Sequence, residues 1–279
     1  MSKAGIKKSF AIEFRKSRWL IPMLMVLSVL GINLAYLFWG MTPEKIRLSD
    51  TMWLPWEESL FSLLFINTLF LSVFMAILAS RTFDMEHKAS SWNLLQTIQS
   101  KNSIFFGKIL FGFFWLLLFC LLQGVSLTLI IKSLGFAGDI PYVRILLALS
   151  GELISGMVVY SIGALLSFMF SSQFASLSIN LGGTLAGFFL MLVTTKPVTP
   201  WSLLPALRAV DMTFQEADSS AHYSWYVAPV SYWLIAGTWL IAVLIIGILI
   251  FHKMEEGVFS PLKKTISIKH RFTPVCRQK

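Results

Sequence analysis

The chain has 279 residues, of which 56% are hydrophobic and 13% charged, and its mean hydropathy is +0.72. Soluble domains carry about a quarter charged residues, so this composition excludes a soluble globule as well as a disordered chain, because both need more polar surface. The formal net charge of +9 raises the question of nucleic-acid binding, which depends on where the basic residues lie.

Residues 1–18 are predicted to form an amphipathic helix at the membrane surface. Ile6, Phe10 and Phe14 recur every four residues and share one helical face, while Arg15 and other basic residues take the other sides. Such a helix lies among membrane lipids, with its apolar side chains in the hydrocarbon and its basic ones near anionic headgroups. The alternative is a basic tail that only sets the topology.

Six stretches are apolar and long enough to cross about 30 Å of hydrocarbon as helices. They lie at about 19–40, 60–80, 104–131, 143–170, 175–195 and 232–251. Transmembrane strands would alternate apolar and polar residues, whereas these stretches are apolar on all sides. The sequence therefore predicts an all-α integral membrane protein, with a six-span domain over 19–252 and a basic tail over 253–279.

The positions of the basic residues predict the orientation of these spans. Lysine and arginine concentrate before the first span, between the second and third spans, and after the sixth. By the positive-inside rule, both ends of the chain are expected to be cytoplasmic. Because this pattern accounts for most of the +9 charge, no nucleic acid is expected as a partner.

The cytoplasmic connection after the second span carries a short amphipathic pattern at about 84–100. Trp92 and Leu95 belong to a narrow apolar stripe, and Asp84, Glu86 and Lys88 lie among the polar residues around it. The segment is too polar to cross the membrane and too periodic to be a plain connector. It therefore suits docking to a soluble partner, and a helix lying flat on the membrane is the alternative.

Polar residues inside the spans are candidates for a pathway or for helix packing. Glu152 is the one carboxylate well inside a predicted span, which suggests a substrate path, a proton relay or a hydrogen bond between helices. Asn67 and Asn180 are expected to join helices or to line a path. Gly183 and Gly187 belong to small-xxx-small patterns, which favour close helix packing.

The outer connection at about 197–230 is rich in proline and tryptophan. Pro200, Trp201 and Pro205 fall in a short apolar stretch that is predicted to dip back into the outer leaflet. Protein must bury irregular backbone at that depth, so this re-entrant segment would cap the bundle. The remainder, at 211–226, is polar and is expected to be solvated.

The sequence contains no motif for catalysis or for a resident cofactor. No histidine lies in mid-span, and no H-E-x-x-H, G-x-S-x-G or P-loop pattern occurs. We therefore expect a non-catalytic chain without a metal site, in which any ATP-driven work depends on another polypeptide.

Together these features resemble the membrane subunits of type-2 ABC exporters (ABC-2 permeases). The chain looks most like the short permeases of bacterial lantibiotic-immunity and bacitracin-resistance transporters. The resemblance is carried by residues 13–17 (EFRKS), by 81–88 (RTFDMEHK) with the run on to Lys108, and by 200–205 (PWSLLP).

The resemblance implies partners and roles. A dimeric ATP-binding-cassette ATPase would hold ATP and Mg²⁺ and would pair with two permease chains, identical or related, in the bacterial cytoplasmic membrane. The segment at 84–100 would be the coupling helix on that ATPase, braced by the helix at 3–18. Spans two and five would line the pathway, and the segment with Pro200, Trp201 and Pro205 would close its outer end as a gate. The cargo would be an amphiphilic peptide antibiotic or a lipid-bound compound expelled from the membrane.

Two other functions stay open on the sequence. One is a membrane sensor that gives immunity by sequestering an antibiotic without transporting it. The other is a secondary transporter or channel, for which Glu152 is the strong coupling-ion candidate, although the six spans show no internal repeat.

Overall fold

The computed structural model describes residues 5–40, 54–89, 99–136, 139–170, 172–194, 196–215 and 220–253. Within these ranges, six helices are long and apolar enough to cross a membrane. They are α2 (Leu20–Gly40), α4 (Leu54–Ala89), α6 (Lys101–Ser133), α7 (Tyr142–Met169), α8 (Gln173–Val193) and α10 (Val230–Lys253). The prediction of six helical spans is therefore confirmed. The observed helices extend beyond the predicted spans mainly at α4 and α6.

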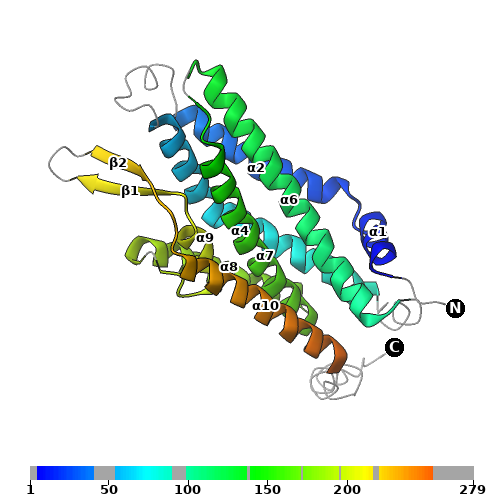
Figure 1. The fold of residues 1–279 in the computed structure, drawn as a ribbon. Helices are drawn as coiled ribbons and strands as arrows, with labels where there is room; N and C mark the ends of the chain where they lie inside the picture. Colours follow the sequence, from blue (N-terminus) through cyan, green and yellow to red (C-terminus); the bar gives the residue numbers. More distant parts are fainter. Residues whose placement is uncertain are drawn as a thin grey trace, which may run out of the picture.

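The helices lie side by side in an elongated bundle, and the short helix α1 (Ile6–Lys16) lies beside the first part of α6 (Figure 1). Arg18 has a φ of 47°, in the left-handed region, so the chain turns between α1 and α2. The carboxyl end of α10 reaches the same end of the bundle, because the Phe251 ring stacks on Phe168 at 4.7 Å and contacts Phe105 at 6.1 Å.

Helix α4 is longer than the predicted second span. It continues to Ala89, since no glycine or proline interrupts 81–89, and it therefore takes in Asp84, Glu86 and Lys88. The segment predicted as a separate short helix at 84–100 thus begins inside the last turns of this span. Trp92 and Leu95 lie outside the described residues, as does the tail at 254–279, so the coupling helix stays a prediction.

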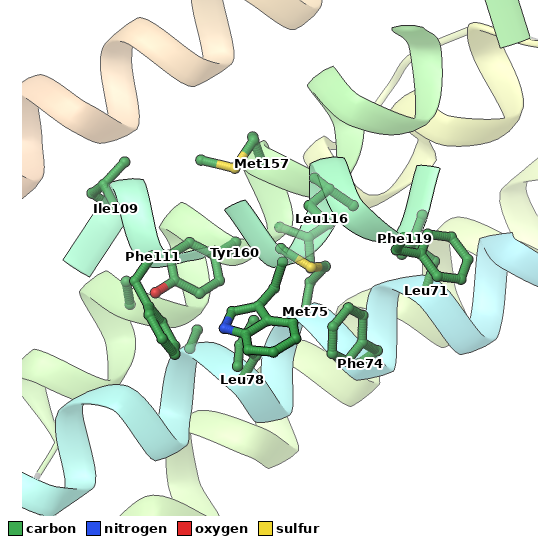
Figure 2. Packing of buried hydrophobic residues seen from close by; sticks show 14 of the residues in the cluster. Leu71, Phe74, Met75, Leu78, Ile109, Phe111, Leu116, Phe119, Met157 and Tyr160 are labelled. Atoms are coloured by element: carbon green, nitrogen blue, oxygen red, sulfur yellow. The ribbon is translucent and has the colours of Figure 1, made fainter. Parts of the chain in front are cut away.

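The core lies between α4, α6 and α7. In Figure 2, Phe111, Leu116 and Phe119 of α6 lie between side chains of α4 and Met157 and Tyr160 of α7. In the most apolar 18-residue stretch of each helix, 61% of the residues are buried in α4, α6 and α7. The share is 33% in α2 and 22% in α8 and α10. The last three helices therefore turn broad apolar faces outward, as lipid-facing or partner-facing spans do.

A β-hairpin in the last connection adds to the predicted all-α class. Strands β1 (Val210–Gln215) and β2 (Ser220–Trp225) pair antiparallel, with Val210 opposite Trp225 and Gln215 opposite Ser220. It lies at the end of the bundle opposite to α1 (Figure 1). The stretch at 211–226, predicted to be solvated, thus forms a strand pair, on which Met212, Thr213, His222 and Ser224 are exposed. Tyr223 and Trp225 anchor the hairpin on the bundle, where the Tyr223 ring meets Phe61 at 5.6 Å.

A short helical segment lies where the re-entrant stretch is predicted. It consists of the 3-10 turn η1 (Pro200–Ser202) and the four-residue helix α9 (Leu203–Ala206). Thr199 and Ser202 form a capping box, in which the Ser202 amide donates to Thr199 Oγ1 at 3.2 Å and the Thr199 amide donates to Ser202 Oγ at 2.9 Å. Most of the segment is buried against α7 and α8. Its place in the outer leaflet stays a prediction.

Candidate functional site

Four charged side chains meet where α1 lies against the ends of α4 and α6. We call Glu13, Lys16, Glu86 and Lys108 the charged junction. Lys108 Nζ donates to Glu86 Oε1 at 2.7 Å, to Glu13 Oε2 at 3.3 Å and to the Thr82 carbonyl at 2.7 Å. Lys16 forms a second ion pair with the same Glu86 oxygen. The junction therefore links three helices through one buried lysine.

Packing of α1 on α6 brings Glu13 and Lys16 to this position. Phe14 stacks on Trp115 at 5.8 Å and meets Phe114 at 5.0 Å. A Cβ on Gly107 would lie 2.8 Å from the Ser9 Cβ, so glycine allows the two backbones to approach. Phe10 and Phe14, predicted to face lipid, thus contact α6 instead. Ile6 and Arg15 stay exposed, as the amphipathic pattern predicts.

Pairing compensates the burial of these charges. Glu86 and Lys108 are fully buried, and Glu13 is nearly so. Burial raises the pKa of Glu13, while the positive charge of Lys108 opposes this rise. Glu86 Oε2 accepts no hydrogen bond from the described residues. A buried charge without its partner is costly, so the junction should hold α1, α4 and α6 as one unit.

Two of the predicted coupling residues, Asp84 and Glu86, lie on α4, and Glu86 belongs to the charged junction. Glu86 points into the bundle and contacts Lys108, whereas the pattern placed it among residues that face a partner. Asp84 is partly buried on the same helix. From the sequence, Lys108 counts only toward the basic residues that set the orientation and toward the family resemblance, because the pairing of side chains on different helices is not visible in a periodic pattern. A lysine two turns inside an apolar helix was the available signal.

A second polar group lies inside the bundle. Asn33, Asn67, Gln123 and Glu152 come from α2, α4, α6 and α7, and all are buried. Asn67 Nδ2 donates to Glu152 Oε1 at 2.8 Å, and Gln123 Nε2 lies 3.0 Å from both carboxyl oxygens. Asn33 Nδ2 donates to Asn67 Oδ1 at 2.9 Å. This amide–carboxyl cluster joins four spans.

The structure brings Asn67 and Glu152 together, two residues that the sequence marked as pathway or packing candidates. It also places them with Asn33 of α2 and Gln123 of α6. Glycine next to Glu152 allows the residue after α9 to approach α7, because a Cβ on Gly151 would lie 2.9 Å from the Leu207 carbonyl oxygen. The cluster therefore lies in closely packed protein, and its contacts match interhelical hydrogen bonding.

The remaining predicted residues meet at α8. Trp201 Nε1 donates to Asn180 Oδ1 at 3.4 Å. A Cβ on Gly183 would come within 2.4 Å of the Trp201 ring, and one on Gly187 within 2.6 Å of the Trp201 carbonyl oxygen. These glycines, predicted to receive another span, thus receive the segment that begins at Pro200. The neighbouring Pro205 is buried on α9, so the segment is held against the bundle.

Comparison with known proteins identifies the family. The sequence model of the family described as ABC-2 family transporter protein matches residues 9–187. This range includes most of α1, the spans α2 to α7 and most of α8. No curated protein matches the chain. The matched region contains the charged junction and the amide–carboxyl cluster. Among the described residues, no group of three His, Cys, Asp or Glu side chains could hold a metal ion. The chain belongs to the ABC-2 transporter family and is a multi-pass membrane subunit that works with an ATP-binding-cassette ATPase.

Proposed function

We propose that this chain is the permease of an ABC exporter that moves an amphiphilic substrate, a peptide antibiotic or a lipid-bound compound, out of the bacterial cytoplasmic membrane. A separate dimeric ATPase would hydrolyse ATP, and a second permease chain, identical or related, would complete the membrane half. The charged junction is the observation that carries the proposal, because it connects the two helices on either side of the predicted coupling segment.

The junction offers a mechanical route from the ATPase to the spans. The predicted segment at 84–100 starts in the last turns of α4 and leads into α6, so a displacement of this segment acts on both helices. Lys108 of α6 binds Glu86 of α4 and Glu13 of α1. Because these pairs are buried, the three helix ends should move together, and α1 should brace the segment.

The outward faces of α8 and α10 support an amphiphilic cargo and a second permease. In the most apolar 18-residue stretch of each of these helices, only 22% of the residues are buried. Phe189 of α8 is 61% exposed and Ile241 of α10 is 60% exposed. A second permease on the α8 side would leave an apolar path along α4 and α8, and an amphiphile could enter such a path from the membrane. The placement of Trp201 over α8 supports a gate at its far end.

The first test of this function is association with the ATPase. Lys88→Glu combined with Trp92→Ala alters the predicted coupling segment without touching the charged junction. We expect this double variant to lose co-purification with the ATPase while its helical content and thermal stability stay at the wild-type level. Lys8→Glu with Trp19→Ala, at exposed positions on α1 and just after it, is the matched control and should keep the ATPase. Full binding by the Lys88/Trp92 variant would refute the coupling segment.

A further inference from the structure

Glu152 is a buried carboxyl group without a basic partner. It is 2% exposed, and in the part of the chain that the structure describes no ion pair reaches it. Its side-chain contacts are the amides of Asn67 and Gln123. An ionised carboxylate away from water is costly unless a cation pairs with it, so the surroundings of Glu152 favour its neutral form.

The charged and titratable groups on the helices around Glu152 do not supply this cation. On α6, Lys132 lies nine residues after Gln123 and Lys108 fifteen before it, roughly 14 and 22 Å away at 1.5 Å per residue. On α7, Arg144 lies eight residues before Glu152, roughly 12 Å away by the same measure, and its guanidinium lies over the Trp225 ring at 5.5 Å. On α4, the nearest such group before Asn67 is a carboxylate, Glu58, roughly 14 Å away by the same measure. Arg208, next to Leu207, which contacts α7, pairs with Asp211 at 2.8 Å. Cys120 of α6 lies one turn before Gln123, and Tyr36 of α2 lies one turn after Asn33.

The three amides can serve both protonation states of this carboxyl. The NH₂ groups of Asn67 and Gln123 are directed at Glu152, and Asn33 donates to the oxygens of both amides, so in this direction the hydrogen bonds suit a carboxylate. An amide that turns by 180° exchanges its oxygen and nitrogen in the same space. If all three turn, the O–H of a protonated Glu152 gains an amide oxygen as acceptor, and Asn67 donates to Asn33. These hydrogen bonds thus run in one direction for the ionised carboxylate and in the opposite direction for the protonated carboxyl.

We propose that Glu152 is a proton-binding site that loads and unloads during the transport cycle. It carries a proton while α2, α4, α6 and α7 are packed as they are here and the amides are turned so that their oxygens face it. It gives that proton to water when these spans separate and water solvates the carboxylate, and it takes one back from water when they close. No other bond changes in this step. The proposal concerns the chain's own conformational cycle and does not depend on the identity of the cargo.

Infrared difference spectroscopy of the full chain in lipid nanodiscs tests the site directly. A protonated carboxylic acid gives a C=O stretching band that a carboxylate lacks. We expect a band at neutral pH that Glu152→Gln removes, and the matched variant Glu57→Gln, at a buried carboxyl near the start of α4, should keep that band. An identical acid band in the wild type and in Glu152→Gln would show that Glu152 is ionised and would overturn the proposal.

Two further measurements keep the proposal testable if Glu152→Gln does not fold. Asn67→Leu leaves Glu152 in place and removes one amide, so it should shift the frequency of the same band, and an unchanged spectrum would contradict the site. With the ATPase bound and a hydrolysis-deficient form held in ATP, the acid band should fall as the spans separate. A band of constant intensity would refute loading and unloading. Absence of export with a normal infrared result would instead count against the proposed function alone.

Discussion

Replacing Lys108 with methionine removes the cation at the centre of the charged junction. Its ammonium group makes three contacts of 2.7–3.3 Å, and its loss leaves Glu13 and Glu86 buried with Lys16 as the remaining cation of the junction. Breaking a buried ion pair from one side costs about 3–5 kcal/mol. The ratio of folded to unfolded protein should therefore fall by roughly two to three and a half orders of magnitude.

Equilibrium unfolding in mixed detergent micelles, followed by tryptophan fluorescence, measures this loss. The triple variant Lys108→Met/Glu86→Leu/Glu13→Gln should recover most of the stability, because it leaves neither carboxylate buried without Lys108, and replacing all partners of a buried ion pair is often neutral. Lys8→Met changes an exposed lysine on α1 and should shift the unfolding free energy by less than about 0.5 kcal/mol. A loss below about 1 kcal/mol in Lys108→Met would refute the view that the junction is a buried structural link.

Two further predictions concern the cap on α8 and the pH response of α1. Gly183→Ala should displace the Trp201 ring, which lies 2.4 Å from the new Cβ, and destabilise the protein by about 1–3 kcal/mol. The control Gly182→Ala adds a Cβ that meets nothing within 4 Å, so it should not destabilise the protein. Equal losses of thermal stability in the two variants would contradict this packing. Because burial raises the pKa of Glu13 from its ordinary value of 4.5, its contribution to stability is present below that value and is lost as the pH rises through the raised pKa. Glu13→Gln should flatten this part of the stability profile, and a profile identical to that of the wild type would refute it.

The spans could be predicted from the sequence because lipid imposes a simple requirement. A helix in hydrocarbon satisfies its own backbone hydrogen bonds and needs about 20 apolar residues, so length and hydropathy locate α2 and α10 within a few residues. The end of α4 could not be located in this way. The polar residues from Arg81 onward suggested that the span had ended, but polarity does not end a helix that extends beyond the hydrocarbon.

The sites were less predictable, because they depend on contacts between helices. Glu152 could be marked from its depth alone, whereas its pairing with Asn67 and Gln123 needed the packing of three spans. Lys108 and Glu86 each looked like surface charges in their own segments. The β-hairpin did leave a signal, since Met212 and Phe214 alternate with polar residues and so do Tyr223 and Trp225. In a six-residue strand, however, such alternation is easily masked by polar composition.

Export from reconstituted vesicles tests the central claim most directly. The chain would be reconstituted with its ATPase and a fluorescent amphiphilic peptide, and ATP would be supplied on the side of the ATPase. ATP-dependent movement of the peptide should occur with the active ATPase and stop with a hydrolysis-deficient one. Protection or peptide binding that persists unchanged with the deficient ATPase would indicate sequestration. Movement driven by an ion gradient without any ATPase would indicate a secondary transporter, and either result would contradict the account.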